Sequence, residues 1–162
     1  MDMSSAESWV WQLGFDIGGT KCAVLLGRVF ASQAEPEIVA REAFATRDYP
    51  GPDAALTKML ELAKAMLSRE GLSLTDIVSA GVSCGGPLDS KRGVVLSPPN
   101  LPGWDEVPVV AILSEAFQVP VRLQNDANAC ALAEHQWGAA RGADTAVFLT
   151  CGTGMGAGLI ID

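Results

Sequence analysis

Residues 13–27 read LGFDIGGTKCAVLLG and hold an aspartate and two glycines between two apolar segments. The apolar segments predict short strands at 13–16 and 22–29, joined by a glycine turn. A plain hairpin needs only the glycines, whose backbone takes turn conformations that other residues avoid. It does not need Asp16 at the end of the first strand, or Thr20 and Lys21 at the start of the second. The stretch therefore has a second interpretation, a loop that binds an anion.

Asp16, Gly18, Gly19, Thr20 and Lys21 carry the groups that a phosphate-binding loop requires. Glycines let backbone N–H groups come close to an anion, and successive N–H groups in a tight turn bind it. A carboxylate at the tip of the strand can hold Mg²⁺, directly or through water, beside the phosphates. A hairpin without a ligand remains the alternative for this segment taken alone.

Strands and helices follow one another along the rest of the chain. A strand at 38–44 completes an antiparallel meander, and a helix follows with Asp53 as its cap and Gly71 just past its end. Further elements are expected as a strand at 76–82, a helix from near Asp105 with Pro108 in its first turn, a strand at 121–124, a helix at 127–137, and strands at 145–150 and 159–162.

A second glycine-rich turn joins the two last strands and contains Gly152, Thr153, Gly154 and Gly156. It lacks the spacing of the dinucleotide fingerprint and no helix follows it, and the chain has no Walker sequence. A flexible turn is the simple interpretation, but so many glycines cost chain entropy unless a ligand uses the open backbone. Two such loops could hold one polyphosphate from two sides.

Asp126 lies between a strand and a helix, in the segment QNDAN at 124–128. An aspartate there can simply cap the helix. It can also orient a substrate hydroxyl and accept its proton as the oxygen attacks phosphorus. Its neighbour Asn125 can contact sugar-like hydroxyls or satisfy the turn. Gly85, Gly86 and Asn100 stand in two further loops, where ordinary turn formation is the alternative to ligand contact.

Composition excludes several classes of protein. A net charge of −8 argues against a general nucleic-acid binder, and no apolar run approaches the roughly 18 residues of a membrane span. The first residues lack the basic start and long apolar run that are typical of a secretory signal, so none is expected. Four scattered cysteines, Cys22, Cys84, Cys130 and Cys151, are expected to be buried free thiols in a reducing compartment. A cytoplasmic protein is therefore expected.

Four ordered motifs together resemble the ROK family of bacterial sugar kinases and related proteins, in the actin/hexokinase ATPase superfamily. They are FDIGGTK at 15–21, GVSCGGPLDSKRGVVLSPPNLPGW at 81–104, QNDANACALAE at 124–134 and FLTCGTGMGAGLIID at 148–162. The resemblance implies an α/β fold. A polar leader at 1–12 would precede an actin-like (ribonuclease H-like) ATPase domain with a mixed sheet at 13–118. Residues 119–162 would begin a second such domain and leave it incomplete.

The resemblance also implies ATP and Mg²⁺ as cofactors, and it implies a role for each candidate site residue. Asp16 to Lys21 would form the first phosphate loop, with Asp16 near Mg²⁺ and holding it through water. Residues 152–158 would form the second, with Gly152, Thr153, Gly154 and Gly156 binding the phosphates. Asp126 would be the base, and Gly85, Gly86, Asn100 and Asn125 would contact a hexose or N-acetylhexosamine. The family's other sugar-binding residues and its cysteine-rich zinc motif would lie beyond Asp162, so zinc is expected only there.

The leading interpretation is the N-terminal portion of an ATP-dependent hexose kinase. The 162-residue chain is expected to be inactive alone, and the full-length protein could form a homodimer. The alternative is a sugar-responsive transcriptional regulator. Its DNA-binding helices would precede the first strand, where 12 residues are too few for them. A non-catalytic sugar or nucleotide binder is the third interpretation, and Asp126 argues against it.

Overall fold

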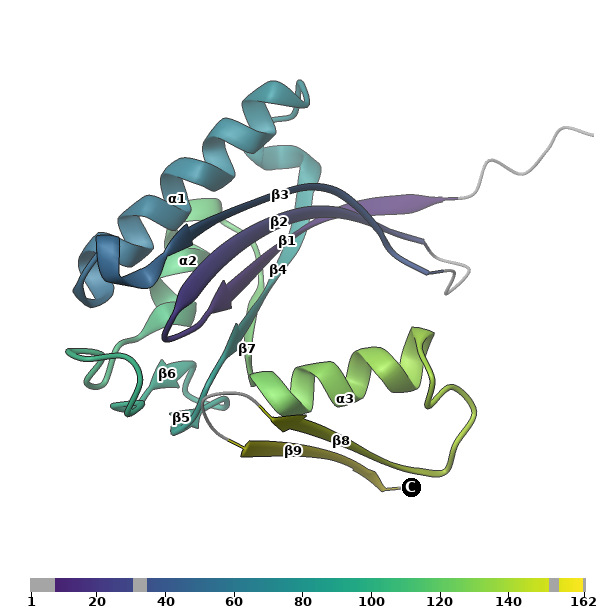
Figure 1. Cartoon of the computed structure of the whole chain (residues 1–162). Coiled ribbons are helices and arrows are strands. Elements are labelled where there is room, and N and C mark those ends of the chain that lie inside the picture. Colours follow the sequence, from purple (N-terminus) through teal and green to yellow (C-terminus); the bar gives the residue numbers. More distant parts are fainter. Residues whose placement is uncertain (1–7, 31–34, 152–154, 162) are drawn as a thin grey trace, which may run out of the picture.

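The computed structural model describes residues 8–30, 35–151 and 155–161, and its main element is a mixed five-stranded sheet (Figure 1). The strand order is β3-β2-β1-β4-β7, with β1, β2 and β3 antiparallel and β4 and β7 parallel to β1. The strands are β1 (Trp9–Ile17), β2 (Lys21–Phe30), β3 (Glu37–Ala45), β4 (Ile77–Cys84) and β7 (Val121–Asn125). The predicted meander and the mixed sheet are confirmed.

Two helices, α1 (Gly51–Arg69) and α2 (Val109–Phe117), cover one face of this sheet. Alternate residues of β1, among them Leu13, Phe15 and Ile17, point into this core and are at most 2% exposed. Phe15 contacts Phe117 of α2 with ring centroids 5.7 Å apart. The residues between them in β1, including Asp16, therefore face the opposite side of the sheet.

A second, smaller layer consists of α3 (Asp126–Trp137) packed against the hairpin of β8 (Thr145–Cys151) and β9 (Met155–Ile161). Gly158 makes this contact possible, because a Cβ there would overlap the carbonyl oxygen of Ala127 and lie 2.7 Å from the Cβ of Ala131. Short elements complete the fold: η1 (Thr46–Asp48), η2 (Leu74–Asp76), β5 (Leu88–Asp89) and β6 (Val94–Val95).

Several predicted element ends need correction. The first helix begins at Gly51 after Pro50 with no side-chain cap, so Asp53 lies in its first turn and does not cap it. The second helix begins at Val109 with Pro108 before it, because Val107 pairs with Val95 and keeps the preceding residues out of the helix.

The predicted domain limits also need correction. Residues 9–12, assigned to the leader, belong to β1, because Trp9 and Trp11 pack against Arg28 of β2. The boundary between residues 118 and 119 cuts off β7, which pairs in parallel with β4 as the fifth strand of the first sheet.

The cysteines divide into two pairs. Cys22 and Cys84 are buried free thiols as predicted, whereas Cys130 and Cys151 are exposed free thiols. The prediction fails for the second pair because Cys130 lies on the side of α3 that no described residue covers, and Cys151 ends a strand of the outer hairpin. No helix in the described part of the chain is long and apolar enough to cross a membrane.

Candidate functional site

The carboxyl ends of three parallel strands bring most of the predicted site residues together. Ile17 of β1 pairs with Cys84 of β4, and Cys84 pairs with Asn125 of β7. The segments that follow these three residues are the first glycine loop, the Gly85–Gly86 loop and the start of α3. Ligands of open α/β sheets bind at this edge, so the topology supports a site here.

Asp16, Ser83 and Gln124 form a row across β1, β4 and β7 on the face that α1 and α2 leave open. Burial raises the pKa of the Asp16 carboxyl above its usual value, Arg41 lowers it, and the negative charge of Asp126 raises it further. The two acids that the sequence singled out therefore interact electrostatically. Arg41 and Ser83 were missed by sequence reasoning, because their proximity comes from strand pairing.

Asn125 caps α3, a role that the sequence allowed for Asp126. The Asn125 side-chain oxygen accepts hydrogen bonds from the N–H groups of Ala127 at 3.1 Å and Asn128 at 3.4 Å. Asp126 is exposed at the first helical position, where its Oδ1 accepts from Ala127 N–H at 2.8 Å. Since Asn125 already caps the helix, the other carboxylate oxygen of Asp126 is left for a ligand.

The Gly85–Gly86 loop lies against this pair of residues. A Cβ at Gly85 would lie 3.9 Å from Oδ2 of Asp126, and one at Gly86 would lie 3.7 Å from Nδ2 of Asn125. Larger side chains would therefore occupy the space beside the acid and the amide. Below the loop, burial raises the pKa of the Cys84 thiol to about 12, with Asp126 as the next largest cause, so the thiol stays protonated.

The first glycine loop packs against Asn100. This contact brings Asn100, another residue that was predicted to contact the sugar, to the site. A Cβ at Gly19 would come within 2.6 Å of both the Cβ and the carbonyl oxygen of Asn100. Gly19 and Thr20 are exposed, and within the described residues their N–H groups donate no backbone hydrogen bond. Both amides are therefore able to donate to an anion. Trp104, in the same loop as Asn100, is 1% exposed and belongs to the hydrophobic core.

The second glycine turn is only partly described. Gly152, Thr153 and Gly154 lie outside the described residues, so their predicted role stays a prediction. Gly156 lies within β9 opposite Thr150, which corrects its predicted place in the turn. The position that a Cβ of Gly156 would take faces α3, at 3.4 Å from the Cβ of Ala127. The start of β9 therefore lies beside the residue that follows Asp126.

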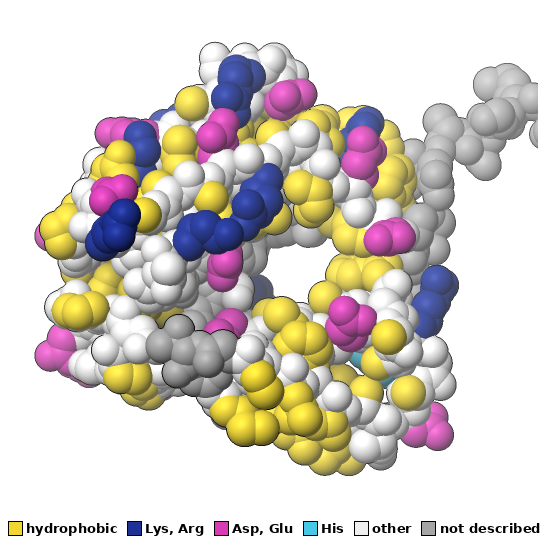
Figure 2. Space-filling model, viewed as in Figure 1, with side chains coloured by type: hydrophobic (Ala, Val, Ile, Leu, Met, Phe, Trp, Pro, Cys, Tyr) yellow, Lys and Arg dark blue, Asp and Glu magenta, His cyan; other side chains and the backbone are white. Residues whose placement is uncertain are grey.

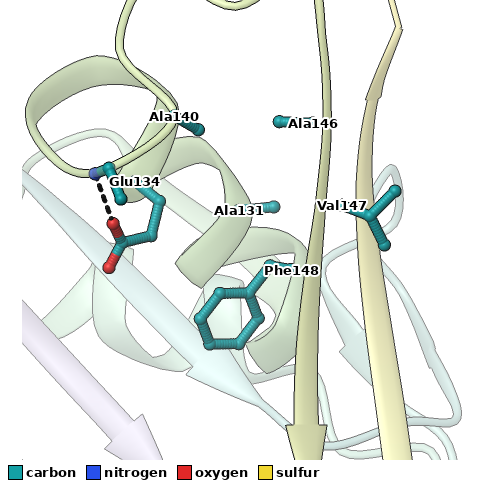
Figure 3. A pocket seen from close by; sticks show the side chains of 7 residues that line it. Ala131, Glu134, Ala140, Ala146, Val147 and Phe148 are labelled. Carbon is teal, nitrogen blue, oxygen red and sulfur yellow. Dashed lines mark hydrogen bonds between the residues drawn. The ribbon is translucent and has the colours of Figure 1, made fainter.

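Two hollows lie near these elements. One, of about 370 Å³, is lined by Gly19, Thr46, Arg47, Pro50, Gly51, Asn100, Leu101, Pro102 and Trp104, on the outer side of the first loop. The other, of about 410 Å³, lies between α3 and β8 and is mostly apolar (Figure 3). There Glu134 accepts a hydrogen bond from Ala139 N–H at 2.8 Å, and none of the predicted site residues lines it.

Within the described residues, no group of three His, Cys, Asp or Glu side chains could hold a metal ion. A single carboxylate is enough for Mg²⁺ when phosphate oxygens and water supply the other ligands. Asp16 fits this requirement, because a cation beside it would offset the burial and the repulsion that raise its pKa. In the space-filling view an opening separates the sheet from the lobe of α3, β8 and β9 (Figure 2).

Comparison with known proteins finds one family. A family model described as the ROK family matches residues 12–162. A fructokinase from Zymomonas mobilis is 38% identical over 116 residues, which is 68% of this chain and 37% of the fructokinase. A xylose repressor from Caldicellulosiruptor bescii is 38% identical over 86 residues, which is 53% of this chain and 21% of the repressor.

Two solved structures have the same fold. A ROK hexokinase from Thermus thermophilus has a TM-score of 0.74 at 34% identity, over 95% of this chain and 47% of the hexokinase. A ROK glucokinase from Streptomyces griseus, solved with glucose and AMPPNP, has a TM-score of 0.71 at 31% identity, over 93% of this chain and 44% of the glucokinase. The chain thus spans less than half the length of these proteins, and the predicted fold class is confirmed.

Proposed function

The chain belongs to the ROK family, and from this premise we propose that it is the front part of a longer, cytoplasmic, ATP-dependent sugar kinase. The reaction transfers the γ-phosphoryl group of ATP to a hydroxyl of a hexose or N-acetylhexosamine. The observation that carries the proposal is the meeting of Asp16, Gly85–Gly86 and Asn125–Asp126 at the carboxyl ends of β1, β4 and β7. Most of the catalysis would come from positioning and charge stabilisation.

Each group has a role that its surroundings support. Asp126 is the base: it is exposed, it is released from capping by Asn125, and its Oδ2 faces the backbone of Gly85. It orients the sugar hydroxyl and accepts its proton as the oxygen attacks phosphorus. Asn125, Gly86 and Asn100 contact the sugar from the two neighbouring loops.

The phosphates of ATP bind to the first glycine loop. The free N–H groups of Gly19 and Thr20 donate to phosphate oxygens, and Lys21 adds positive charge. Gly152, Thr153 and Gly154, which lie outside the described residues, act as a second phosphate loop, and Gly156 follows them in the sequence near the start of β9. Asp16 would hold Mg²⁺ through water, and the cation would supply positive charge beside the phosphates.

Replacing the base tests the proposal. Asp126→Asn in the full-length protein should lower kcat for sugar phosphorylation by about 10²–10⁴-fold, because the amide cannot accept the proton. The dissociation constant of the sugar, measured by calorimetry, should change by less than about threefold, since Asn can still accept a hydrogen bond.

Asp53→Asn is the matched control, because Asp53 is also an exposed acid in the first turn of a helix. It should leave kcat unchanged. Unchanged phosphorylation in Asp126→Asn would remove Asp126 as the base. If the wild-type protein phosphorylates no hexose or N-acetylhexosamine at saturating Mg·ATP, the kinase proposal fails, and the regulator class to which the related xylose repressor belongs becomes the leading one.

A further inference from the structure

Thr46 is hydrogen-bonded to the first glycine loop, although it lies 28 positions after Gly18 in the sequence. It lies directly after β3. Among the described residues it is the one polar residue that is buried, with 9% of its surface exposed. Its hydroxyl donates a hydrogen bond to the carbonyl oxygen of Gly18 at 2.6 Å. Its backbone N–H donates to the carbonyl oxygen of Thr20 at 3.0 Å. One residue thus holds two carbonyl groups of the loop.

Holding these carbonyls fixes the direction of the loop's donors. The peptide bond is planar and trans, so the N–H of a peptide unit points away from its carbonyl. With the Gly18 carbonyl held toward Thr46, the N–H of Gly19 points away from Thr46. The N–H of Gly19 is one of the two amides that donate no backbone hydrogen bond among the described residues and that remain for an anion.

Cys22 reinforces the same contact from β2. Its Sγ lies 3.4 Å from Oγ1 of Thr46 and 3.7 Å from the carbonyl oxygen of Gly18. Burial raises the pKa of this thiol, so it stays protonated and acts as a donor. The thiol contact is longer than the hydroxyl contact, so the hydroxyl dominates the hold on Gly18.

We propose that Thr46 is a positioning residue for phosphate binding, and that its hydroxyl orients the Gly18–Gly19 peptide so that the Gly19 N–H faces the phosphates of ATP. The inference rests on the proposed function in one respect, that the first loop binds ATP phosphates. Thr46 touches neither the phosphates nor the sugar, and acts only through the loop.

The test compares three variants of the full-length protein. Thr46→Val keeps the shape and removes the hydroxyl, and it should weaken Mg·ATP binding, measured by calorimetry, by about tenfold. Thr46→Ser keeps the hydroxyl and should bind Mg·ATP within about twofold of wild type. Thr57→Val makes the same chemical change at an exposed position of α1 and should bind like wild type. The dissociation constant of the sugar should stay unchanged in all three.

The outcomes separate positioning from simple stability. A Thr46→Val variant that lowers Tm but binds Mg·ATP like wild type overturns the inference, and so does a wild-type protein that binds no Mg·ATP. If Thr46→Val does not fold, Thr46→Ser decides: a lowered Tm with wild-type affinity supports the hydroxyl, and weakened affinity overturns it. A wild-type protein that binds Mg·ATP but phosphorylates no sugar refutes the kinase proposal, while the calorimetry still decides the role of Thr46.

Discussion

Among single residues, Asp16 is the one where the stability of the fold and the proposed chemistry conflict. Burial and then Asp126 raise the pKa of its carboxyl, so ionised Asp16 destabilises the folded chain. We therefore expect Asp16→Asn to raise the Tm of the full-length protein at neutral pH by roughly 1–3 °C. The same change should lower kcat by about 10²–10³-fold, because the proposed ligand of Mg²⁺ is lost. Thermal unfolding and sugar phosphorylation, measured on one preparation, check both effects.

The effect of pH on stability should also reflect that ionised Asp16 destabilises the folded chain. Because the pKa of Asp16 is raised in the folded state, its favourable contribution to stability is present below the ordinary carboxyl pKa of 3.8 and is lost as pH rises through the folded pKa. The Tm difference between Asp16→Asn and wild type should therefore be near zero at about pH 3.5 and grow as pH rises through the folded pKa of Asp16. In an Asp126→Asn background the difference should shrink, since one source of repulsion is gone. A difference that is independent of pH would contradict this assignment.

At the scale of elements, the contact between α3 and β9 depends on one glycine. A Cβ at Gly158 would overlap the backbone of Ala127, which cannot move without shifting the start of α3. Gly158→Ala is expected to reduce the free energy of unfolding by about 1–3 kcal/mol. Because Asp126 is the first residue of α3, the same change should also lower kcat. Urea denaturation and kinetics of the full-length protein measure the two effects.

Gly81→Ala is the control for this prediction. Gly81 lies inside β4, and a Cβ there meets nothing within 4 Å among the described residues. Its replacement should change the free energy of unfolding by less than about 0.5 kcal/mol. Equal effects of the two substitutions would show that the close approach of Gly158 to α3 has no energetic importance.

How much of these elements the sequence predicts depends on how local the signal is. The strand ends beside Asp16 and Asn125 and the positive-φ glycine after α1, Gly71, follow from periodicity and turn residues, and they are found where expected. The sequence allowed Asp126 as the cap of α3, whereas Asn125 caps it; a sequence pattern does not separate the two, because Asn and Asp cap equally well. The role of Thr46 has no local signal, since its contact with Gly18 spans 28 residues. The exposure of Cys130 depends on which elements cover α3, which no short stretch of sequence determines.

For the whole molecule, the outer face of the β8–β9 hairpin has no cover among the described residues. Alternate residues of both strands face α3. Those between them include five large apolar side chains that are more than half exposed: Val147, Leu149, Met155, Leu159 and Ile161. Figure 2 shows apolar side chains gathered over this lobe. A two-stranded sheet with one bare apolar face is marginal in water. This is what we expect if the hairpin begins a larger sheet in the full-length protein, as the proposed second actin-like domain requires.

Polar substitutions on this face should therefore act in opposite directions in the short and the long chain. Leu149→Ser with Leu159→Ser should reduce dye binding to exposed apolar surface and self-association of the 162-residue chain, which should not phosphorylate sugar in either form. In the full-length protein the same pair should lower the free energy of unfolding by about 2–5 kcal/mol for each buried leucine. Leu74→Ser, at a 37% exposed position in η2, is the control. It should change the free energy of unfolding of either chain by less than about 0.5 kcal/mol. If the double variant leaves the full-length protein as stable as wild type, this face stays in solvent there, and β8–β9 does not begin a second sheet.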